Sequence, residues 1–320
     1  MREAFRDPAA LLEAVGLPEL VKSVSASAQA QFPLKVPRGY AARMRAGDAN
    51  DPLLRQVLPL LDEDRVAAGF TLDAVGDSAA KGGTGVIQKY DGRALLIATG
   101  SCAIHCRYCF RRHFPYAEET AAAGGWAAAL AWIDAHPEVG EIILSGGDPL
   151  SLSTAKLAEL TDALRSRPQI RRLRLHTRLP VVLPERVDDA LLHWLGGLPW
   201  PVVVVLHANH ANEIDAAVTT ACRRLAGAGS ILFNQAVLLR GVNDSTKALV
   251  DLSEALFGAG VLPYYLHLLD RVQGTAHFEV PEAEALAMHA AVHASLPGYL
   301  VPRLVREIAG EPGKSAIVSA

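Results

Sequence analysis

The pattern of apolar and polar positions changes near residue 80 of this chain. Before that point, DPAALLEAVGL and DPLLRQVLPLLDEDRVA carry apolar residues at the spacing of helices. After it, short apolar and β-branched runs appear, which predict strands. These runs are Ala94–Thr99, Glu141–Ser145, Arg172–His176, Val202–His207, Ile231–Leu238 and Leu262–Leu269.

Segments with helical periodicity lie between most of these runs, and from the second run onward the strands recur about every thirty residues. The segments are Thr154–Arg165, Glu185–Trp194, Glu213–Ala226 and Lys247–Leu256. Strand and helix alternating in this way predict consecutive βαβ units and a parallel sheet. Six units fit a doubly wound open sheet or a partial or complete (β/α) barrel, and the period does not distinguish these architectures.

The domain organisation follows from the same change of pattern. No low-complexity linker interrupts residues 85–320, so we expect one domain there, preceded by a helical extension over residues 1–84. In both candidate architectures the active site lies at the C-terminal ends of the strands. A cysteine-rich loop follows the first run, SGGDP follows the second, His207 ends the fourth and Asp270 ends the sixth.

Composition narrows the class of protein. The chain has 320 residues, 50% of them apolar and 20% charged, with a net charge of −3. The chain therefore has no excess of basic residues of the kind that nucleic-acid-binding proteins carry. The first residues mix charges into apolar positions unlike a signal peptide, and the apolar runs are too short to span a bilayer. We expect a cytoplasmic enzyme with neither nucleic acid nor membrane as a partner.

Three of the four cysteines form a C-x3-C-x2-C pattern, Cys102, Cys106 and Cys109. Thiolates suit iron–sulfur clusters and zinc. Three of them leave one iron of a 4Fe–4S cluster open for a substrate, whereas a zinc site would need completion by His105 or His113. The fourth cysteine, Cys222, lies alone in a predicted helix, where cysteine packs as a small apolar residue.

The cysteine pattern after a first strand resembles the radical S-adenosylmethionine (SAM) superfamily. The resemblance implies a 4Fe–4S cluster on the three cysteines, SAM on the open iron, and cleavage of SAM to a 5′-deoxyadenosyl radical. Gly146, Gly147 and Asp148 match the glycine-rich turn that contacts the amine of SAM. His207 and Gln235 match further SAM-contacting positions.

Several further segments resemble the lysine 2,3-aminomutase family over residues 85–318. They are CRYCFRRHF, NQAVLLRGVND, PYYLHLLDRVQGTAHF and the tail GYLVPRLVREIAGEPGKSAIV. The length and CRYCFRRHFPY resemble the short branch that makes (R)-β-lysine for elongation factor P. Longer members carry additional metal-binding cysteines near the C-terminus, which this chain lacks. The resemblance implies a partial (β/α)6 TIM-like barrel without structural zinc.

The family resemblance also implies pyridoxal 5′-phosphate (PLP), bound as a Schiff base to Lys314 in GEPGK. Lys89, Tyr90 and Arg93 match the region that binds the PLP phosphate. Taken alone, a lysine in a C-terminal tail is usually a solvated surface residue. A Schiff-base lysine must be nucleophilic, so its pKa needs lowering by burial or a cationic neighbour. We therefore expect the tail to fold into the mouth of the barrel.

The implied substrate is L-lysine, whose amino group migrates between Cα and Cβ. Arg111 matches the arginine that holds the substrate carboxylate, a group suited to bidentate binding by guanidinium. Asp270 and Glu307 match the two acids that receive the ε-ammonium group, with glutamate at the second position where longer members have aspartate. Implied partners are a reductant such as flavodoxin or ferredoxin, and elongation factor P with its ligase.

Two other functions remain open on the sequence alone. One is a different radical SAM reaction, on another amino acid or without PLP, although the pair Asp270 and Glu307 favours a cationic substrate. The other is a non-enzymatic carrier of an iron–sulfur cluster or zinc. Such a carrier would need neither Lys314 nor the SGGDP turn.

Overall fold

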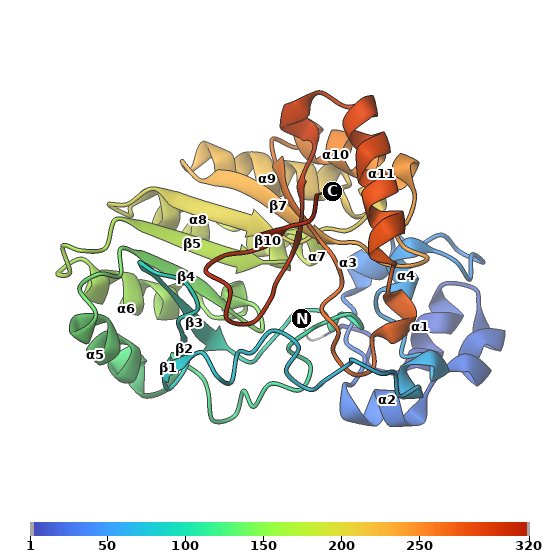
Figure 1. Ribbon diagram of the computed structural model, residues 1–320, viewed down its shortest axis with the longest axis horizontal. Helices are drawn as coiled ribbons and strands as arrows, with labels where there is room; N and C mark the ends of the chain where they lie inside the picture. The colour runs from blue at the N-terminus through green and yellow to red at the C-terminus, as the bar shows by residue number, and fades with distance from the viewer. Residues whose placement is uncertain (1–2, 319–320) are drawn as a thin grey trace.

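The centre of the molecule is a single sheet whose ten strands lie in chain order, β1 to β10 (Figure 1). The computed structural model describes residues 3–318. Seven neighbouring strands are parallel. They are β3 (Arg93–Thr99), β4 (Glu141–Gly146), β5 (Arg172–Thr177), β6 (Val202–Leu206), β7 (Ile231–Val237), β8 (Leu262–His267) and β9 (Arg303–Arg306).

Antiparallel strands extend this sheet at both edges. β1 (Lys81–Gly83) and β2 (Val86–Ile87) precede β3, and β10 (Ser315–Ala316) pairs with β9. Within residues 3–318 the strand order ends at β1 and β10, so the barrel is open. The C-terminal tail, dark red in Figure 1, crosses in front of the sheet before it reaches β10.

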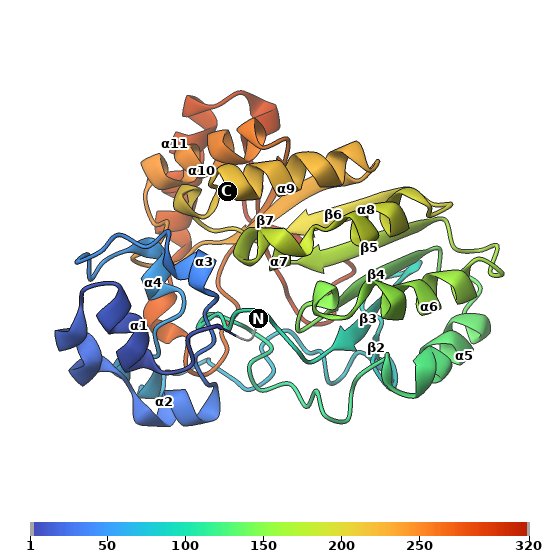
Figure 2. The same ribbon diagram turned by 180° about the vertical axis from the view of Figure 1, so that it is seen from behind.

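Helices follow each of the strands β3 to β8 and cover the outer face of the sheet (Figure 2). They are α5 (Ala127–Ala135), α6 (Thr154–Leu164), α8 (Asp189–Gly196), α9 (Ala216–Gly227), α10 (Thr246–Gly258) and α11 (Glu282–Ser295), with the short α7 (Leu179–Val182) before α8. Six strand–helix units around one open parallel sheet confirm the expected partial (β/α)6 barrel.

Local sequence explains where these elements lie. All six residues of β4 are buried, as expected for a parallel strand that is covered on both faces. In β5, burial alternates: Leu173 and Leu175 are buried in the core, whereas Arg174 and His176 are only partly buried. Four of the outer helices begin at a serine or aspartate whose side chain accepts a backbone N–H, which favours helix initiation there. These N-caps are Ser153, Asp188, Asp215 and Ser245.

The segment before the barrel consists of short helices: α1 (Pro8–Ala14), α2 (Ala26–Gln31), α3 (Arg38–Ala41) and α4 (Pro52–Arg55). They lie together at one side of the sheet, blue in Figure 1. Leu11, Leu12, Leu53 and Leu54 are at most 1% exposed and belong to the same apolar core as the barrel helices. This segment therefore packs firmly on the barrel.

Some expected boundaries differ from those observed. The periodicity of residues 51–67 predicted a long helix, but only α4 and a 3-10 turn at Leu61–Asp64 form. Pro59 explains the break, because proline lacks an N–H and disfavours helical backbone in the residue before it. The helix expected from Glu185 begins at Asp189, where Asp188 caps it. Neither α5 nor β9 was expected.

The outer helices are also short relative to a bilayer. In the range 3–318 none is long and apolar enough to cross a membrane.

Candidate active site

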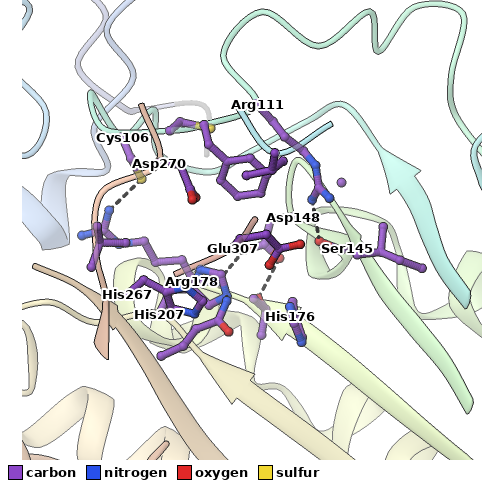
Figure 3. Close-up of a pocket in the computed structure, with 18 of the residues that line it drawn as sticks. Cys106, Arg111, Ser145, Asp148, His176, Arg178, His207, His267, Asp270 and Glu307 are labelled. Carbon is purple, nitrogen blue, oxygen red and sulfur yellow. Dashed lines mark hydrogen bonds between the residues drawn. The ribbon is translucent and has the colours of Figure 1, made fainter. Parts of the chain in front are cut away.

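A cavity of about 450 Å³ opens at the C-terminal ends of the parallel strands (Figure 3). All the site residues expected from the sequence line it. They are Cys102, Cys106, Cys109, Lys89, Tyr90, Arg93, Arg111, Gly146, Gly147, Asp148, His207, Gln235, Asp270, Glu307 and Lys314. The cavity also contains side chains that sequence reasoning missed: Asp77, His176, Arg178 and His267.

The cysteine loop follows β3 and is anchored by an acid from the N-terminal segment. Glu63 accepts hydrogen bonds at 2.7 and 2.6 Å from Arg107, whose side chain is fully buried. The same carboxylate accepts one at 2.7 Å from Arg112. Because these arginines flank Cys109 in sequence, one buried carboxylate fixes the loop on both sides of that cysteine.

Burial shapes the chemistry of the thiols. It raises the pKa of Cys102 well above its usual range, with Cys109 adding to the effect, and it raises the pKa of Cys109 to about 11. These thiols are therefore protonated at neutral pH, and binding a metal would release their protons. Among residues 3–318 no three His, Cys, Asp or Glu side chains converge on a single ion. A four-iron cluster does not require such convergence, because each thiolate binds a different iron.

The SGGDP turn after β4 is held directly against the cysteine loop. The Gly147 N–H donates to the Thr99 carbonyl at 2.6 Å, and the Asp148 N–H donates to that of Ser101 at 2.8 Å. A Cβ atom on Gly147 would lie 2.5 Å from the Ser101 oxygen, so only glycine fits there. Gly146 has a φ of +118°, a conformation that also favours glycine.

Asp148 is buried, and its carboxylate is occupied by bonds within the protein. It accepts hydrogen bonds from the Thr177 hydroxyl at 2.7 Å and from the N–H groups of Arg178 and Leu150 at 2.8 and 3.0 Å. Burial raises its pKa to about 6, against the opposing effect of these hydrogen bonds. The carboxylate ties the SGGDP turn to the end of β5.

A chain of charges of alternating sign runs along the cavity wall to the cysteine loop. Lys314 Nζ lies 2.6 Å from Glu307, which contacts Lys89 at 3.2 Å. Lys89 lies 2.7 Å from Asp77, and Asp77 lies 2.6 Å from Nε of Arg111. Asp77 comes from the segment before the barrel and is joined to no recognisable motif, so the sequence carries no signal for it.

The two acids expected to receive a cationic group differ in protonation. Asp270 is half-buried, and burial raises its pKa to about 7 although Lys314 opposes the shift. Burial also acts to raise the pKa of Glu307, but Lys314 and Lys89 outweigh it and hold that pKa at about 2. Both face the cavity in Figure 3. Glu307 is thus an anion paired with lysines, whereas Asp270 titrates near neutrality.

The region expected to bind a phosphate is rich in cations. The Arg93 guanidinium stacks on the Tyr90 ring at 4.6 Å, and Lys89 lies alongside in the cavity wall. In the described part of the chain, Nε of Arg93 is buried without a hydrogen-bond partner. An unsatisfied buried donor is costly, so this group fits an anionic ligand.

Histidines at or just after the ends of three strands line the same cavity. His207 Nε2 lies 2.9 Å from the Gln235 amide nitrogen, and the His176 ring lies 6.0 Å from that of His207. Burial lowers the pKa of His207 to about 3, with Arg178 adding to the effect, and lowers that of His176 and His267 well below the usual range. All three are neutral imidazoles. Alternation along Arg172–His176 could have indicated that His176 and Arg174 share the inner face.

Together, an open (β/α)6 barrel, a cavity at its strand ends and a cysteine loop on its first strand define an enzyme site. The chain is 45% identical over 99% of its length to "L-lysine 2,3-aminomutase" of Escherichia coli (strain K12), covering 93% of that protein. It is 44% identical over 98% of its length to the Haemophilus influenzae protein of the same name, again covering 93%. The chain belongs to the L-lysine 2,3-aminomutase family.

More distant similarities complete the comparison. A protein named L-lysine 2,3-aminomutase from Clostridium subterminale is 34% identical over 87% of this chain, which covers 67% of that protein. No family model matches the chain. A solved radical SAM methyltransferase from Sphaerobacter thermophilus is 17% identical with a TM-score of 0.49, covering 69% of this chain and 68% of that one. Aminomutases are isomerases, which confirms the expected enzyme class.

Proposed function

We propose that this protein converts L-α-lysine to β-lysine, using a 4Fe–4S cluster, SAM and PLP. The observation that carries the proposal is that one cavity contains both the cysteine loop and the charged side chains of Lys314, Glu307 and Lys89. Family membership at 45% identity supports the same reaction.

The cysteine loop fits an iron–sulfur cluster with SAM on its open iron. Cys102, Cys106 and Cys109 are free thiols lining the cavity, and the SGGDP turn beside them brings backbone close to any bound ligand. A reduced cluster with SAM supplies a radical that abstracts hydrogen. The chain contributes the thiolates and the fixed loop, while His207 and Gln235 offer neutral polar groups to the nucleoside part of SAM.

The lysine-rich side fits PLP. Lys314 lies in the cavity wall over the Tyr265 ring at 5.7 Å, and Arg93 offers an unpartnered buried donor to a phosphate. PLP, when bound, supplies a conjugated ring that would stabilise an unpaired electron on the substrate attached to it. An amine that acts as a nucleophile is uncharged, so the ion pair of Lys314 with Glu307 does not persist in the reactive state.

Substrate orientation follows from charge. Arg111 is 8% exposed, with Nε held by Asp77 and Nη1 donating to Ser145 at 3.1 Å. We assign it the substrate carboxylate, and assign the ε-ammonium group to Asp270 and Glu307. Glu307 carries a second role, because it also pairs with Lys314. Burial of the substrate between these groups excludes water from the radical.

The finer assignments extend this proposal. The Escherichia coli and Haemophilus influenzae relatives match this chain over 93% of their own length, in keeping with the short branch of the family. We therefore propose (R)-β-lysine as the product, for modification of elongation factor P by a separate ligase in the cytoplasm. A flavodoxin or ferredoxin would reduce the cluster.

The test is anaerobic turnover. The protein is reconstituted with iron and sulfide, reduced, and incubated with SAM, PLP and L-lysine, and the amino acids are separated on a chiral column. We expect β-lysine to accumulate, and to disappear when PLP or SAM is omitted. Cleavage of SAM without β-lysine would contradict the proposal, and so would rearrangement of a neutral amino acid at a higher rate than lysine.

A further inference from the structure

A buried arginine after β5 contacts one of the cluster cysteines. Arg178 is 6% exposed, and its Nη1 lies 2.7 Å from Sγ of Cys106 (Figure 3). No other cation has a contact with a cysteine sulfur among the hydrogen bonds of residues 3–318. Arg178 belongs to none of the motifs recognised in the sequence.

The other end of the guanidinium is fixed by three groups. Nη2 donates to Glu213 at 2.7 Å, to the side-chain oxygen of Gln56 at 2.7 Å and to the Tyr40 hydroxyl at 3.2 Å. The Tyr40 and Tyr108 rings lie 5.5 and 5.6 Å from its central carbon. These contacts hold the guanidinium with Nη1 directed at the Cys106 sulfur.

The carboxylate behind Arg178 is itself immobile. Glu213 is fully buried, and its Oε1 accepts from the Asn209 and His210 N–H groups at 2.8 and 3.1 Å and from Gln56 at 3.2 Å. Two of the groups in this cluster, Tyr40 and Gln56, come from the segment before the barrel and are themselves fully buried. The N-terminal segment thus completes the environment of a residue that acts at the cysteine loop.

A comparison within the chain shows that this is not merely a buried ion pair. Arg107 is equally buried and also pairs with a glutamate, Glu63. Its remaining donors bind the carbonyls of Phe32 and Ala28, so its hydrogen bonds are made to the protein scaffold and not to a group in the cavity. Arg178 instead leaves Nη1 for a sulfur in the cavity. A buried ion pair contributes little to stability by itself, so stability does not account for the placement of Arg178. The direction of its Nη1, toward the Cys106 sulfur, needs another explanation.

We propose that Arg178 is a positioning residue for the iron–sulfur centre and makes that centre easier to reduce. In this proposal Tyr40 and Gln56 hold the Arg178 side chain against Cys106. The inference rests on the proposed function, because it requires Cys106 to bind iron. Reduction adds one negative charge to the cluster, and a fixed cation donating to a ligand sulfur stabilises that charge. Hydrogen bonds to the sulfurs and local charge are known to set cluster potentials.

The test is an anaerobic redox titration of the reconstituted protein, followed by electron paramagnetic resonance of the reduced cluster. In Arg178→Gln we expect reduction to be at least tenfold less favourable, a shift of about 59 mV to lower potential for one electron. Arg178→Lys, which keeps the charge, should shift less. Glu213→Gln should shift the potential upward, because it removes an anion while the Gln56 and Tyr40 oxygens still accept hydrogen bonds from Nη2 of Arg178.

An electrostatic role predicts potential shifts of opposite sign for Arg178→Gln and Glu213→Gln. A purely structural role predicts that both variants shift the potential in the same direction. Arg107→Gln is the matched control, because it removes an equally buried arginine without a sulfur contact, and it should shift the potential by less than Arg178→Gln. Tyr40→Phe and Gln56→Leu should move it in the direction of Arg178→Gln by a smaller amount. Unchanged potentials in these two would overturn the part assigned to the N-terminal segment.

Iron content and thermal unfolding are measured on every variant, so that loss of the cluster is recognised. If Arg178→Gln does not retain iron, Arg178→Lys and Glu213→Gln still decide the sign. An Arg178→Gln cluster with the wild-type potential would overturn the inference and leave the proposed function intact. A wild-type protein that binds no iron at Cys106 would overturn the proposed function itself.

Discussion

At the scale of single residues, the cavity shifts the pKa values of two carboxyl groups in opposite directions. The folded-state pKa of Asp270 is about 7, above the value of about 3.9 for an unfolded chain. The folded state therefore holds an extra proton, and stability falls as pH rises from about 4 to about 7. Glu307 behaves in the opposite way, because its pKa of about 2 lies below the unfolded value. Its contribution is present above about pH 4.3 and is lost as pH falls toward 2.

We predict opposite effects of neutralising these two acids in the cofactor-free protein. Asp270→Asn should increase the free energy of unfolding by about 1–3 kcal/mol at pH 8, with a smaller gain at pH 5. Glu307→Gln should lower it by about 1–3 kcal/mol at both pH values, because Lys314 loses its carboxylate partner and Lys89 keeps only Asp77. Urea unfolding at the two pH values measures both effects. If Asp270→Asn were destabilised at pH 8, the raised pKa of Asp270 would be contradicted.

The second residue-scale prediction concerns Lys314. If it holds PLP, borohydride should fix the cofactor as a secondary amine on the peptide that contains Lys314, and mass spectrometry will locate it. Lys314→Ala should lose covalent PLP but retain iron, because the ion-pair partner of Lys314 in the structure is Glu307 and not a cysteine. Lys247 is a suitable reference, since it is exposed and paired with Asp251. An adduct on Lys89 or Lys247 would show that the assignment is wrong.

The residues recovered from the sequence and those missed differ in a physical way. Cys102, Gly147 and Lys314 belong to short segments whose residue types carry their chemistry with them. Asp77 and Arg178 act through partners far along the chain: Arg178 meets Gln56 across 122 residues. No local pattern encodes such a meeting, because it depends on how the N-terminal segment packs on the barrel.

At the scale of elements, the contact between the SGGDP turn and the cysteine loop depends on a missing side chain. Gly147→Ala would place a Cβ atom 2.5 Å from the Ser101 oxygen, so one of the two segments must move. We predict loss of most bound iron after reconstitution and destabilisation of about 1–3 kcal/mol. Gly258→Ala is the control, since a Cβ atom there meets nothing within 4 Å at the end of α10. Iron content equal in both variants would contradict the prediction.

The strands were predictable because buried parallel strands form continuous apolar runs such as Val202–Leu206. Their ends were less so: the run to Leu269 continues two residues past the end of β8 at His267, because apolar residues also line the strand-end cavity. β9 was missed because arginines at both ends of Arg303–Arg306 mask its buried pair. α5 was missed because its sequence, AAALAWIDA, is apolar on nearly all sides.

At the scale of the whole molecule, Glu63 links the N-terminal segment to the cysteine loop. Glu63→Gln would leave Arg107 and Arg112 buried without a counter-charge. Removing one partner of a buried pair costs about 3–5 kcal/mol. We predict a loss of that size in urea unfolding, with reduced iron retention. Glu159→Gln breaks only the exposed pair with Lys156 and should change stability by less than about 1 kcal/mol. Equal effects would show that Glu63 does not anchor the loop.

The attachment of the C-terminal tail has a consequence for exchange of its amide hydrogens. β10 has only two residues, and beyond their pairing with β9 the Ile317 N–H bonds to Leu304 at 3.0 Å. A segment held by so few bonds opens at a small fraction of the global unfolding free energy. Amides 315–317 should therefore exchange with deuterium long before those of β4 and β6. The lysine proposed to carry PLP would thus lie next to a segment that opens far more readily than the buried strands, so that ligands can enter without unfolding the barrel.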